Sequence, residues 1–197
     1  MSPTTSEVFT LHGGARLEYW PHWLDLDAAS ALVKTLAGSA PWEQRVMRLG
    51  GRAVPQPRLT AWYGERAYTY SGVTHEPAPW LPELADLRAR LWTLTGHRFN
   101  SVLLNLYRCG ADSVGMHADN ERGLGPDPVI ASVSLGATRT FKMQHATDRR
   151  EKFSLALAHG SLLVMGRGVQ AQWRHGIPKT TASVGMRINL TFREMVE

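Results

Sequence analysis

A histidine and an aspartate two positions apart, His117 and Asp119, are the side chains of this sequence best suited to bind a metal ion. Successive side chains of a strand alternate between its two faces, so a His-x-Asp pair would present an imidazole and a carboxylate to one point. With a second histidine from a later strand, this set would suit Fe(II) and leave its other coordination positions open. His175 is the candidate for this third ligand, although a lone His-x-Asp is also typical of a polar strand end.

Polar side chains at two-residue spacing mark two other predicted strands. Asn105 and Tyr107 form one pair, and the segment 187–193 alternates polar and apolar residues. The polar face of that segment consists of Arg187, Asn189, Thr191 and Arg193. One interpretation is an amphipathic strand whose polar face lies in water, and the other is the polar mouth of a barrel. In a barrel, Arg187 could pair with both oxygens of a carboxylate, because its planar guanidinium has the matching geometry.

The composition is that of an ordinary globular protein, with 197 residues, 43% hydrophobic and 20% charged. We therefore expect one domain over 1–197, with a helical and lid region at 1–98 and a β core at 99–197. No apolar run reaches the ~20 residues of a membrane helix, and no secretory signal is visible. The single cysteine, Cys109, excludes an internal disulfide and a zinc finger. From these features we expect a cytoplasmic protein that does not bind membranes.

Hydrophobic spacing predicts helices at 24–36 and 83–95, and Asp25 and Asp27 are N-cap candidates for the first. The other segments expected in the first half are an irregular arm at 1–23, a loop or short hairpin at 41–58, and short aromatic strands at 59–63 and 67–70.

From residue 100 onward, short apolar runs alternate with Gly, Asp or Pro, and no helix of useful length is evident. This pattern predicts the strands of a sandwich or barrel. The expected strands are 101–107, 128–135, 139–145, 152–158, 161–166, 169–175 and 184–192. The predicted fold class is therefore α+β dominated by β, with the helices covering one face of a sheet.

Arginine and aromatic residues are interleaved in the first half of the chain. The net charge is +5, and the stretch from Gln44 to Arg66 holds one acidic residue, Glu65. Its basic residues are Arg45, Arg48, Arg52, Arg58 and Arg66, and the aromatic residues among and beside them are Trp42, Trp62, Tyr63, Tyr68 and Tyr70. A solvated loop could carry such a run. However, single-stranded or flipped nucleotides require arginines for phosphates and aromatic faces for bases, so we expect a nucleic-acid partner.

Several segments, in the same order, resemble the AlkB family of Fe(II)- and 2-oxoglutarate-dependent dioxygenases, which oxidatively dealkylate nucleic-acid bases. The resemblance rests on the order N-x-Y, H-x-D, H and R-x-N-x-T-x-R. The matching segments are NLYRCGADSVGMHADNE (105–121), PVIASVSLGATRTF (128–141), HG (159–160), HGIPK (175–179) and RINLTFR (187–193). More loosely, TAWYGERAYTYSG at 60–72 resembles the family's nucleotide-recognition lid. The resemblance implies a double-stranded β-helix, or jelly roll, as the core.

The resemblance also implies the identity of the metal site. His117, Asp119 and His175 would be the ligands of Fe(II), with 2-oxoglutarate and O₂ as cosubstrates. Imidazole and carboxylate groups suit ferrous iron, in agreement with this assignment.

Five polar residues would bind 2-oxoglutarate by the same resemblance. Arg187 would hold its distal carboxylate, and Asn105 and Tyr107 would form hydrogen bonds to it. Asn189 and Arg193 would lie beside the keto-acid end, where Arg193 offsets negative charge. A dianion requires such cations.

Substrate contacts are expected from a third group of residues. In the family an acid at the position of Glu121 faces the target base, and a carboxylate there would favour a cationic methylated base over a neutral one. Trp62 and Tyr68 are the best stacking candidates, with core packing as the alternative for each. The expected contacts to the strand are Arg45, Arg48 and Arg52.

Together these features predict oxidative demethylation of 1-methyladenine and 3-methylcytosine in DNA or RNA, with release of formaldehyde, as a DNA alkylation repair reaction. No obligate protein partner is expected. Two alternatives remain open: a 2-oxoglutarate oxygenase that acts on a protein, lipid or small molecule, and a non-catalytic metal-binding jelly roll.

Overall fold

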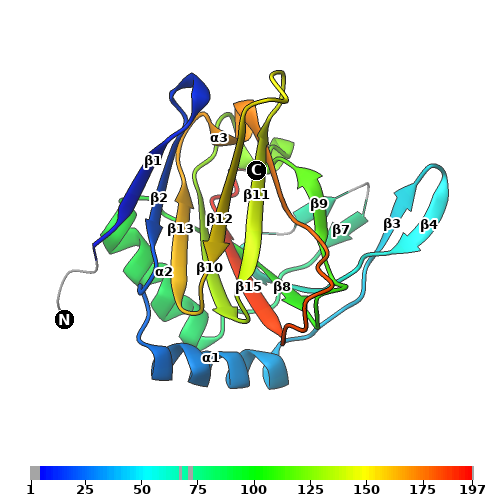
Figure 1. Cartoon of the computed structure of the whole chain (residues 1–197). Coiled ribbons are helices and arrows are strands. Elements are labelled where there is room, and N and C mark those ends of the chain that lie inside the picture. Colours follow the sequence, from blue (N-terminus) through cyan, green and yellow to red (C-terminus); the bar gives the residue numbers. More distant parts are fainter. Residues whose placement is uncertain (1–4, 67, 71–72, 197) are drawn as a thin grey trace.

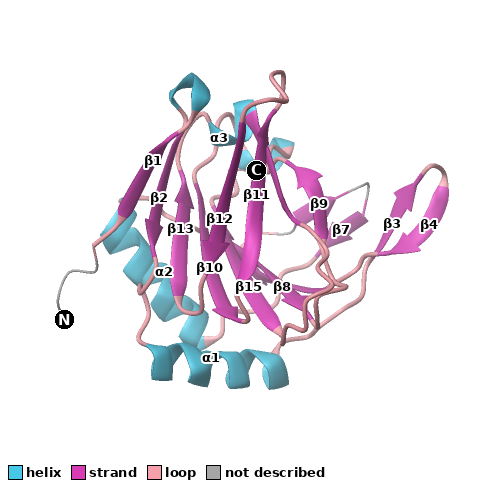
Figure 2. Ribbon diagram, in the orientation of Figure 1, coloured by secondary structure: helices cyan, strands magenta, loops and turns pink. Residues whose placement is uncertain are grey.

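Two sheets face each other, and helices lie against the outer side of the larger one (Figures 1 and 2). The structure is a computed structural model that describes residues 5–66, 68–70 and 73–196. The large sheet has the order β1 (Glu7–Thr10), β2 (Arg16–Trp20), β13 (Ser161–Met165), β10 (Ile130–Gly136), β15 (Arg187–Arg193), β8 (Ser101–Tyr107) and β5 (Leu59–Gly64). The small sheet has the order β12 (Lys152–Leu157), β11 (Arg139–His145), β14 (Trp173–Ile177) and β9 (Val114–His117). This antiparallel, mostly β architecture confirms the predicted fold class.

The seven predicted strands of the second half are confirmed, except at 169–175. There the chain forms a four-residue helix, α3 (Val169–Gln172), before β14 begins. The Asp127 carboxylate accepts a hydrogen bond of 2.5 Å from the Gly168 backbone N–H, which fixes the start of this turn. The sequence VQAQ alternates like a strand, so spacing alone gave the wrong element.

The irregular arm predicted at 1–23 is wrong, because β1 and β2 extend the large sheet beyond β13. Leu17 and Tyr19 on β2 are buried between the sheets, while Arg16 is exposed. A five-residue strand gives too few repeats for a clear periodic signal. Strands from before and after residue 98 thus share one sheet. The predicted division into a helical and lid region at 1–98 and a β core at 99–197 does not separate the sheet from the rest of the chain.

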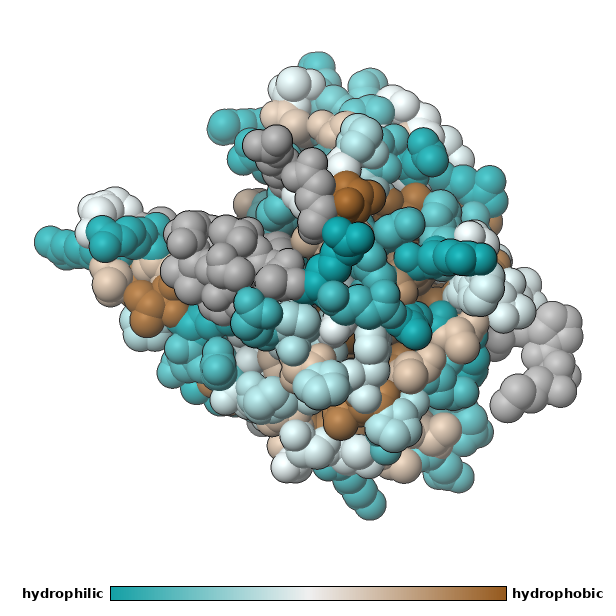
Figure 3. Space-filling view, turned by 180° about the vertical axis from the view of Figure 1, so that it is seen from behind, coloured by the Kyte–Doolittle hydropathy of each residue, from teal (hydrophilic) through white to brown (hydrophobic). Residues whose placement is uncertain are grey.

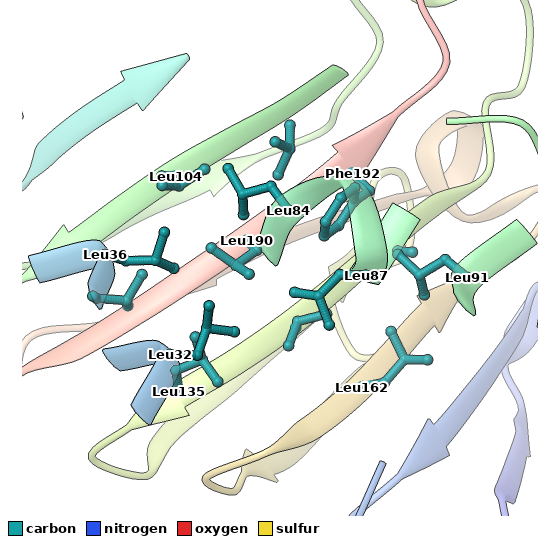
Figure 4. Packing of buried hydrophobic residues seen from close by; sticks show 14 of the residues in the cluster. Leu32, Leu36, Leu84, Leu87, Leu91, Leu104, Leu135, Leu162, Leu190 and Phe192 are labelled. Carbon is teal, nitrogen blue, oxygen red and sulfur yellow. The ribbon is translucent and has the colours of Figure 1, made fainter. Parts of the chain in front are cut away.

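Both predicted helices are confirmed, as α1 (Leu26–Ser39) and α2 (Pro82–Thr95). Asp25 caps α1 by accepting hydrogen bonds from the backbone N–H groups of Asp27 and Ala28. Gly96, with φ 73°, ends α2. Leucines of the helices pack on leucines of the outer face of the large sheet, as Figure 4 shows. The helix residues are Leu32, Leu36, Leu84, Leu87 and Leu91, and the strand residues are Leu104, Leu135 and Leu190. Truncating one such leucine to alanine costs about 2–5 kcal/mol, so this layer fixes the sheet that carries the site.

Two hairpins lie beside the sheets. The segment 41–58 forms the predicted hairpin, from β3 (Val46–Leu49) and β4 (Arg52–Pro55), and it projects from the body of the molecule (Figure 1). Gly50 and Gly51 join its strands with φ of 55° and 80°, values that favour glycine. The second hairpin consists of β6 (Tyr68–Tyr70) and β7 (Val73–His75). Of the predicted lid at 60–72, residues 60–64 belong to β5 of the large sheet and 68–70 to β6, while 67, 71 and 72 lie outside the described residues. Two short 3-10 turns are η1 (His12–Gly14) and η2 (Arg122–Leu124).

The face of the molecule seen in Figure 3 is largely polar, with apolar residues in separate spots. Within the described residues, no helix has the length and apolar character needed to cross a membrane.

Candidate active site

The three predicted metal ligands converge between the sheets. The distance from Asp119 Oδ1 to His117 Nε2 is 3.9 Å, and that from Asp119 Oδ2 to His175 Nε2 is 3.5 Å. One candidate donor atom from each residue lies within 4.8 Å of the others. Two donors that bind one ion at about 2 Å lie at most about 4 Å apart, and the two distances from Asp119 meet this limit. The geometry therefore allows one metal ion to contact all three side chains.

Sheet register produces this convergence. His175 on β14 lies directly opposite His117 on β9, and their rings are 4.5 Å apart. Gly176 permits the close approach of the strands, because a Cβ atom there would lie 2.8 Å from the Val114 carbonyl oxygen. One detail of the prediction is wrong: β9 ends at His117, so Asp119 lies just after the strand rather than on it.

Neighbouring groups orient the ligands. His117 Nδ1 lies 2.9 Å from the Gly115 carbonyl oxygen, so it donates there as N–H and leaves Nε2 for a metal. The Asp119 backbone N–H donates to Gln170 Oε1 at 2.9 Å. Gln170 itself is 2% exposed and belongs to α3. The helix that spacing failed to predict therefore fixes the carboxylate ligand.

Charge also holds Asp119 ionised. Burial alone would raise the pKa of this carboxyl, but the Arg193 guanidinium, which donates a hydrogen bond to Oδ1, together with His175 keeps that pKa well below its usual range. Burial, followed by the charge of His175, lowers the pKa of His117. A negative carboxylate and neutral imidazoles are the protonation states that a divalent cation requires.

A polar inner chamber extends from the three ligands between the two sheets, over the inner faces of β8 and β15. Arg187 pairs with Tyr107 across these strands, and Asn189 pairs with Asn105. The polar face of β15 is buried, so the alternative of a strand face in water is wrong. The other residues that line the inner chamber include Arg58, Leu103, Val114, Ser132, Phe141, Thr191 and Arg193.

Arg187 is a buried cation with unused donors. It is 1% exposed, and Nη2 donates to Ser134 Oγ at 2.9 Å. Among the described residues, Nε and Nη1 have no hydrogen-bond acceptor. Burial lowers the pKa of the Arg187 guanidinium. An anion beside it would raise that pKa again, because it stabilises the charged form. A buried guanidinium with two vacant donors fits a carboxylate ligand.

Asn189 and Arg193 line the same chamber but already have partners. Asn189 Nδ2 donates to Ser132 Oγ at 2.8 Å and to the Val133 carbonyl at 3.0 Å, while Thr191 donates to Asn189 Oδ1. Both N–H donors of Asn189 are used in this network. Its predicted contact to a cosubstrate therefore requires a rearrangement of the amide, whereas Arg193 acts first on Asp119.

A second, outer chamber adjoins the metal ligands on the side of the β3–β4 hairpin. It is lined by Arg45, Met47, Gln56, Arg58, Thr60, Leu103, Val114, Gly115, Met116, His117, Asp119, Glu121 and Arg193. Glu121 thus lines the same chamber as His117 and Asp119, and its predicted contact with a base stays a prediction. Arg45 lines the chamber, whereas Arg48 and Arg52 are exposed on the hairpin and do not.

The predicted stacking residues have different outcomes. Trp62 is 3% exposed and packs against Leu103, Leu124 and Met195, while its indole N–H donates to the Arg66 carbonyl at 3.1 Å. Within the described residues, Trp62 therefore packs in a small apolar cluster, as in the core-packing alternative. The backbone of Tyr68 belongs to β6, but its side chain lies outside what the structure describes.

Comparisons with known proteins agree with this geometry. A family model for the 2OG-Fe(II) oxygenase superfamily matches residues 16–193. Alpha-ketoglutarate-dependent dioxygenase alkB homolog 3 of Rattus norvegicus is 46% identical over 190 residues, which cover 92% of this chain and 64% of that protein. Its Bos taurus counterpart is 44% identical, with 98% of this chain and 68% of that protein covered. The chain belongs to the AlkB family of 2OG-Fe(II) oxygenases.

Other AlkB-family proteins match less closely. DNA oxidative demethylase ALKBH2 of Homo sapiens is 42% identical over 149 residues, which cover 71% of this chain and 57% of that protein. The structure of OsALKBH1 is similar in fold, with a TM-score of 0.61 and 17% identity over 90% of this chain and 97% of that one. This chain spans less than two thirds of the length of the rat relative.

The site fits the cofactors of the AlkB family. Two imidazoles and a carboxylate are the donors that suit Fe(II), and the vacant donors of Arg187 suit one carboxylate of 2-oxoglutarate.

Three contributors to this AlkB-family site were missed from the sequence. Gln170 was assigned to a strand, and Arg58 was counted only within the basic run. Arg139 is 3% exposed, donates to the carbonyls of Asp112 and Pro178, and lies 5.8 Å from the ring of Tyr107. An arginine on an alternating strand is normally read as solvent-facing, and the contacts of Gln170 and Arg58 come from distant segments, so spacing gave no signal for these three residues.

Proposed function

We propose that this chain is an Fe(II)- and 2-oxoglutarate-dependent dioxygenase that removes N-linked methyl groups from 1-methyladenine and 3-methylcytosine in nucleic acid. The methyl group is hydroxylated and leaves as formaldehyde, which makes the reaction one of alkylation repair. The observation that carries the proposal is the junction of the two chambers at His117 and Asp119. One chamber suits a keto diacid and the other holds a carboxylate, Glu121, next to the metal ligands.

When bound, Fe(II), 2-oxoglutarate and O₂ supply the oxidant, and succinate and CO₂ are released. His117, Asp119 and His175 would hold the iron, and Asp119 must stay ionised, which Arg193 ensures. Arg187 would grip one carboxylate of the cosubstrate from the buried end of the inner chamber, beside Tyr107.

The outer chamber would hold the target base. The Glu121 carboxylate would attract a base that carries a fixed positive charge, as 1-methyladenine and 3-methylcytosine do. Met47, Met116 and Leu103 supply apolar surface around it, which suits an unstacked base. Arg45 in the wall, and Arg48 and Arg52 on the hairpin, would contact the phosphates on either side.

The names of the relatives support a nucleic-acid substrate, since one group is named DNA oxidative demethylase. The test is a panel of short oligonucleotides, in DNA and RNA, each with one modified base. We expect a mass loss of one methylene group from 1-methyladenine and 3-methylcytosine, with equimolar formaldehyde. Turnover of 2-oxoglutarate without loss from any member of the panel would favour a protein, lipid or small-molecule substrate. No binding of 2-oxoglutarate to metal-loaded protein would favour a non-catalytic jelly roll.

A further inference from the structure

Arg58 occupies the boundary between the two chambers and is one of few polar residues that line both. It is the last residue before β5, whose Thr60 pairs with Asn105 on β8. Its side chain is half-buried, and Nε donates to Asn105 Oδ1 at 2.8 Å. Arg58 is thus in direct contact with the proposed cosubstrate site while it faces the proposed substrate site.

The backbone around Arg58 is held in place. The preceding Pro57 restricts the chain, and its carbonyl accepts a hydrogen bond of 2.9 Å from the Ser113 N–H. The Arg58 N–H donates to the Gln56 carbonyl at 2.8 Å, and the Gln56 N–H donates to the Arg45 carbonyl at 2.7 Å. The freedom of this segment therefore lies in the guanidinium rather than in the main chain.

The bond to Arg58 determines which way the Asn105 amide faces. A guanidinium only donates hydrogen bonds, so the group beside Nε must be the amide oxygen of Asn105. The two N–H donors of that amide then remain for another acceptor, and an anionic cosubstrate supplies one. Asn105 is 7% exposed, so it has few other ways to satisfy them.

The outer end of Arg58 has no fixed partner. Across the ranges that the structure describes, no acceptor or carboxylate binds its two terminal amino groups. These donors form a planar fork that matches two oxygens of a phosphate. A phosphate beside a target base in the outer chamber would engage them and so fix the guanidinium.

We propose that Arg58 is a positioning residue that couples binding of the nucleotide strand in the outer chamber to binding of 2-oxoglutarate in the inner chamber, through Asn105. The inference rests on the proposed function. A bound phosphate immobilises Arg58, Arg58 fixes the Asn105 amide, and the amide presents its donors to the cosubstrate. Because binding free energies are linked, the cosubstrate strengthens strand binding by the same factor.

The experiment measures 2-oxoglutarate binding by titration calorimetry on Mn(II)-loaded protein without oxygen, where no turnover occurs. Each titration is done without and with a saturating single-stranded oligonucleotide that carries one 1-methyladenine. For the wild-type protein, we expect the oligonucleotide to lower the Kd of 2-oxoglutarate about fivefold or more. In Arg58→Met, the ratio of the Kd of 2-oxoglutarate without the oligonucleotide to that with it should fall to near one.

Further variants test whether the loss of coupling in Arg58→Met comes from the lost hydrogen bonds rather than from the lost charge or from misfolding. Arg58→Lys keeps the charge but loses the fork, so the ratio should also fall. Arg48→Met removes an exposed charge from the hairpin, so the oligonucleotide should bind more weakly while the ratio at saturation stays as in the wild-type protein. In a double-mutant cycle, Asn105→Ala added to Arg58→Met should remove no further coupling. Equal melting temperatures of the variants check that they fold.

A wild-type ratio in Arg58→Met would overturn the proposal, as would a ratio of one in the wild-type protein when the oligonucleotide binds. In either case demethylation of the oligonucleotide panel would still support the proposed function. Failure of the wild-type protein to bind the methylated oligonucleotide at all would overturn the proposed function and this inference with it.

Discussion

The inner and outer chambers share His117 and Asp119 but are built in different ways. Paired strands line much of the inner chamber, and its polar side chains are buried and joined by hydrogen bonds such as that from Arg187 to Ser134. Strands also line much of the outer chamber, but loop residues and the β3–β4 hairpin complete its wall, in which Met116 is 44% exposed. The difference indicates that sheet register fixes the metal and cosubstrate geometry, whereas the substrate side combines strands with loops and a projecting hairpin.

The largest effect is expected when a residue that lines both chambers is removed. In Asp119→Ala the metal loses its anionic ligand and Arg193 loses a buried partner. We expect metal affinity to fall at least about 100-fold and the metal-free protein to lose about 3 kcal/mol of stability. Calorimetric Mn(II) titration and thermal unfolding measure the two effects. Retained metal affinity would show that Asp119 is not a ligand.

A change confined to the inner chamber should affect the cosubstrate alone. Arg187→Met removes charged hydrogen bonds worth about 1.5–3 kcal/mol, so the KM for 2-oxoglutarate should rise about 10- to 100-fold. Mn(II) affinity should stay as in the wild-type protein. Arg187→Lys, which keeps the charge without the fork, is the matched control and should give an intermediate KM. An unchanged KM in Arg187→Met would place the dicarboxylate elsewhere.

A change confined to the outer chamber should affect selection of the base. Glu121→Gln keeps the shape of the side chain but removes its charge. We expect the ratio of kcat/KM for 3-methylcytosine, which is cationic, to that for a neutral alkylated base to fall about fivefold, equivalent to about 1 kcal/mol. The KM for 2-oxoglutarate should not change. An equal loss on both bases would assign Glu121 a structural role.

The smallest effect is expected from the exposed arginines of the β3–β4 hairpin. Arg52→Met should weaken oligonucleotide binding for every sequence tested and reduce the dependence of log Kd on log salt by about one. Fluorescence anisotropy at several salt concentrations measures this slope. Arg150→Met, which removes an exposed charge outside both chambers, is the control and should leave the slope unchanged. Equal slopes for Arg52→Met and the wild-type protein would exclude a phosphate contact.

The sequence predicted the parts of the site that depend on strand periodicity. The polar face of 187–193 follows from two-residue alternation, and the structure brings it together with the His-x-Asp pair and the distant His175. Spacing could not show that β9 ends at His117, or that α3 supplies Gln170 behind the carboxylate. Those features depend on backbone contacts between distant segments, which periodicity does not encode.

Predictions for the residues of the outer chamber depended on residue type alone, and they identified fewer of its lining residues. Trp62 is an aromatic residue in a basic stretch, but it is buried and packs against Leu103 of the neighbouring strand and against Leu124 and Met195. Alternation puts Thr60 and Trp62 on the same face of β5, and only the tertiary structure shows that one lines a chamber while the other packs in a small apolar cluster. Arg58 was equally hidden, because its importance comes from one hydrogen bond to Asn105.

The position of β2 beside β13 has a consequence for any shortened form of this chain. Leu162, Leu163 and Val164 on β13 are paired with β2, so removing the first twenty residues would leave without partners the backbone N–H and C=O groups of β13 that face β2. An apolar strand exposed in this way is a template for pairing with other molecules. A trimmed protein would therefore be prone to aggregate, even though every residue of the two chambers would still be present.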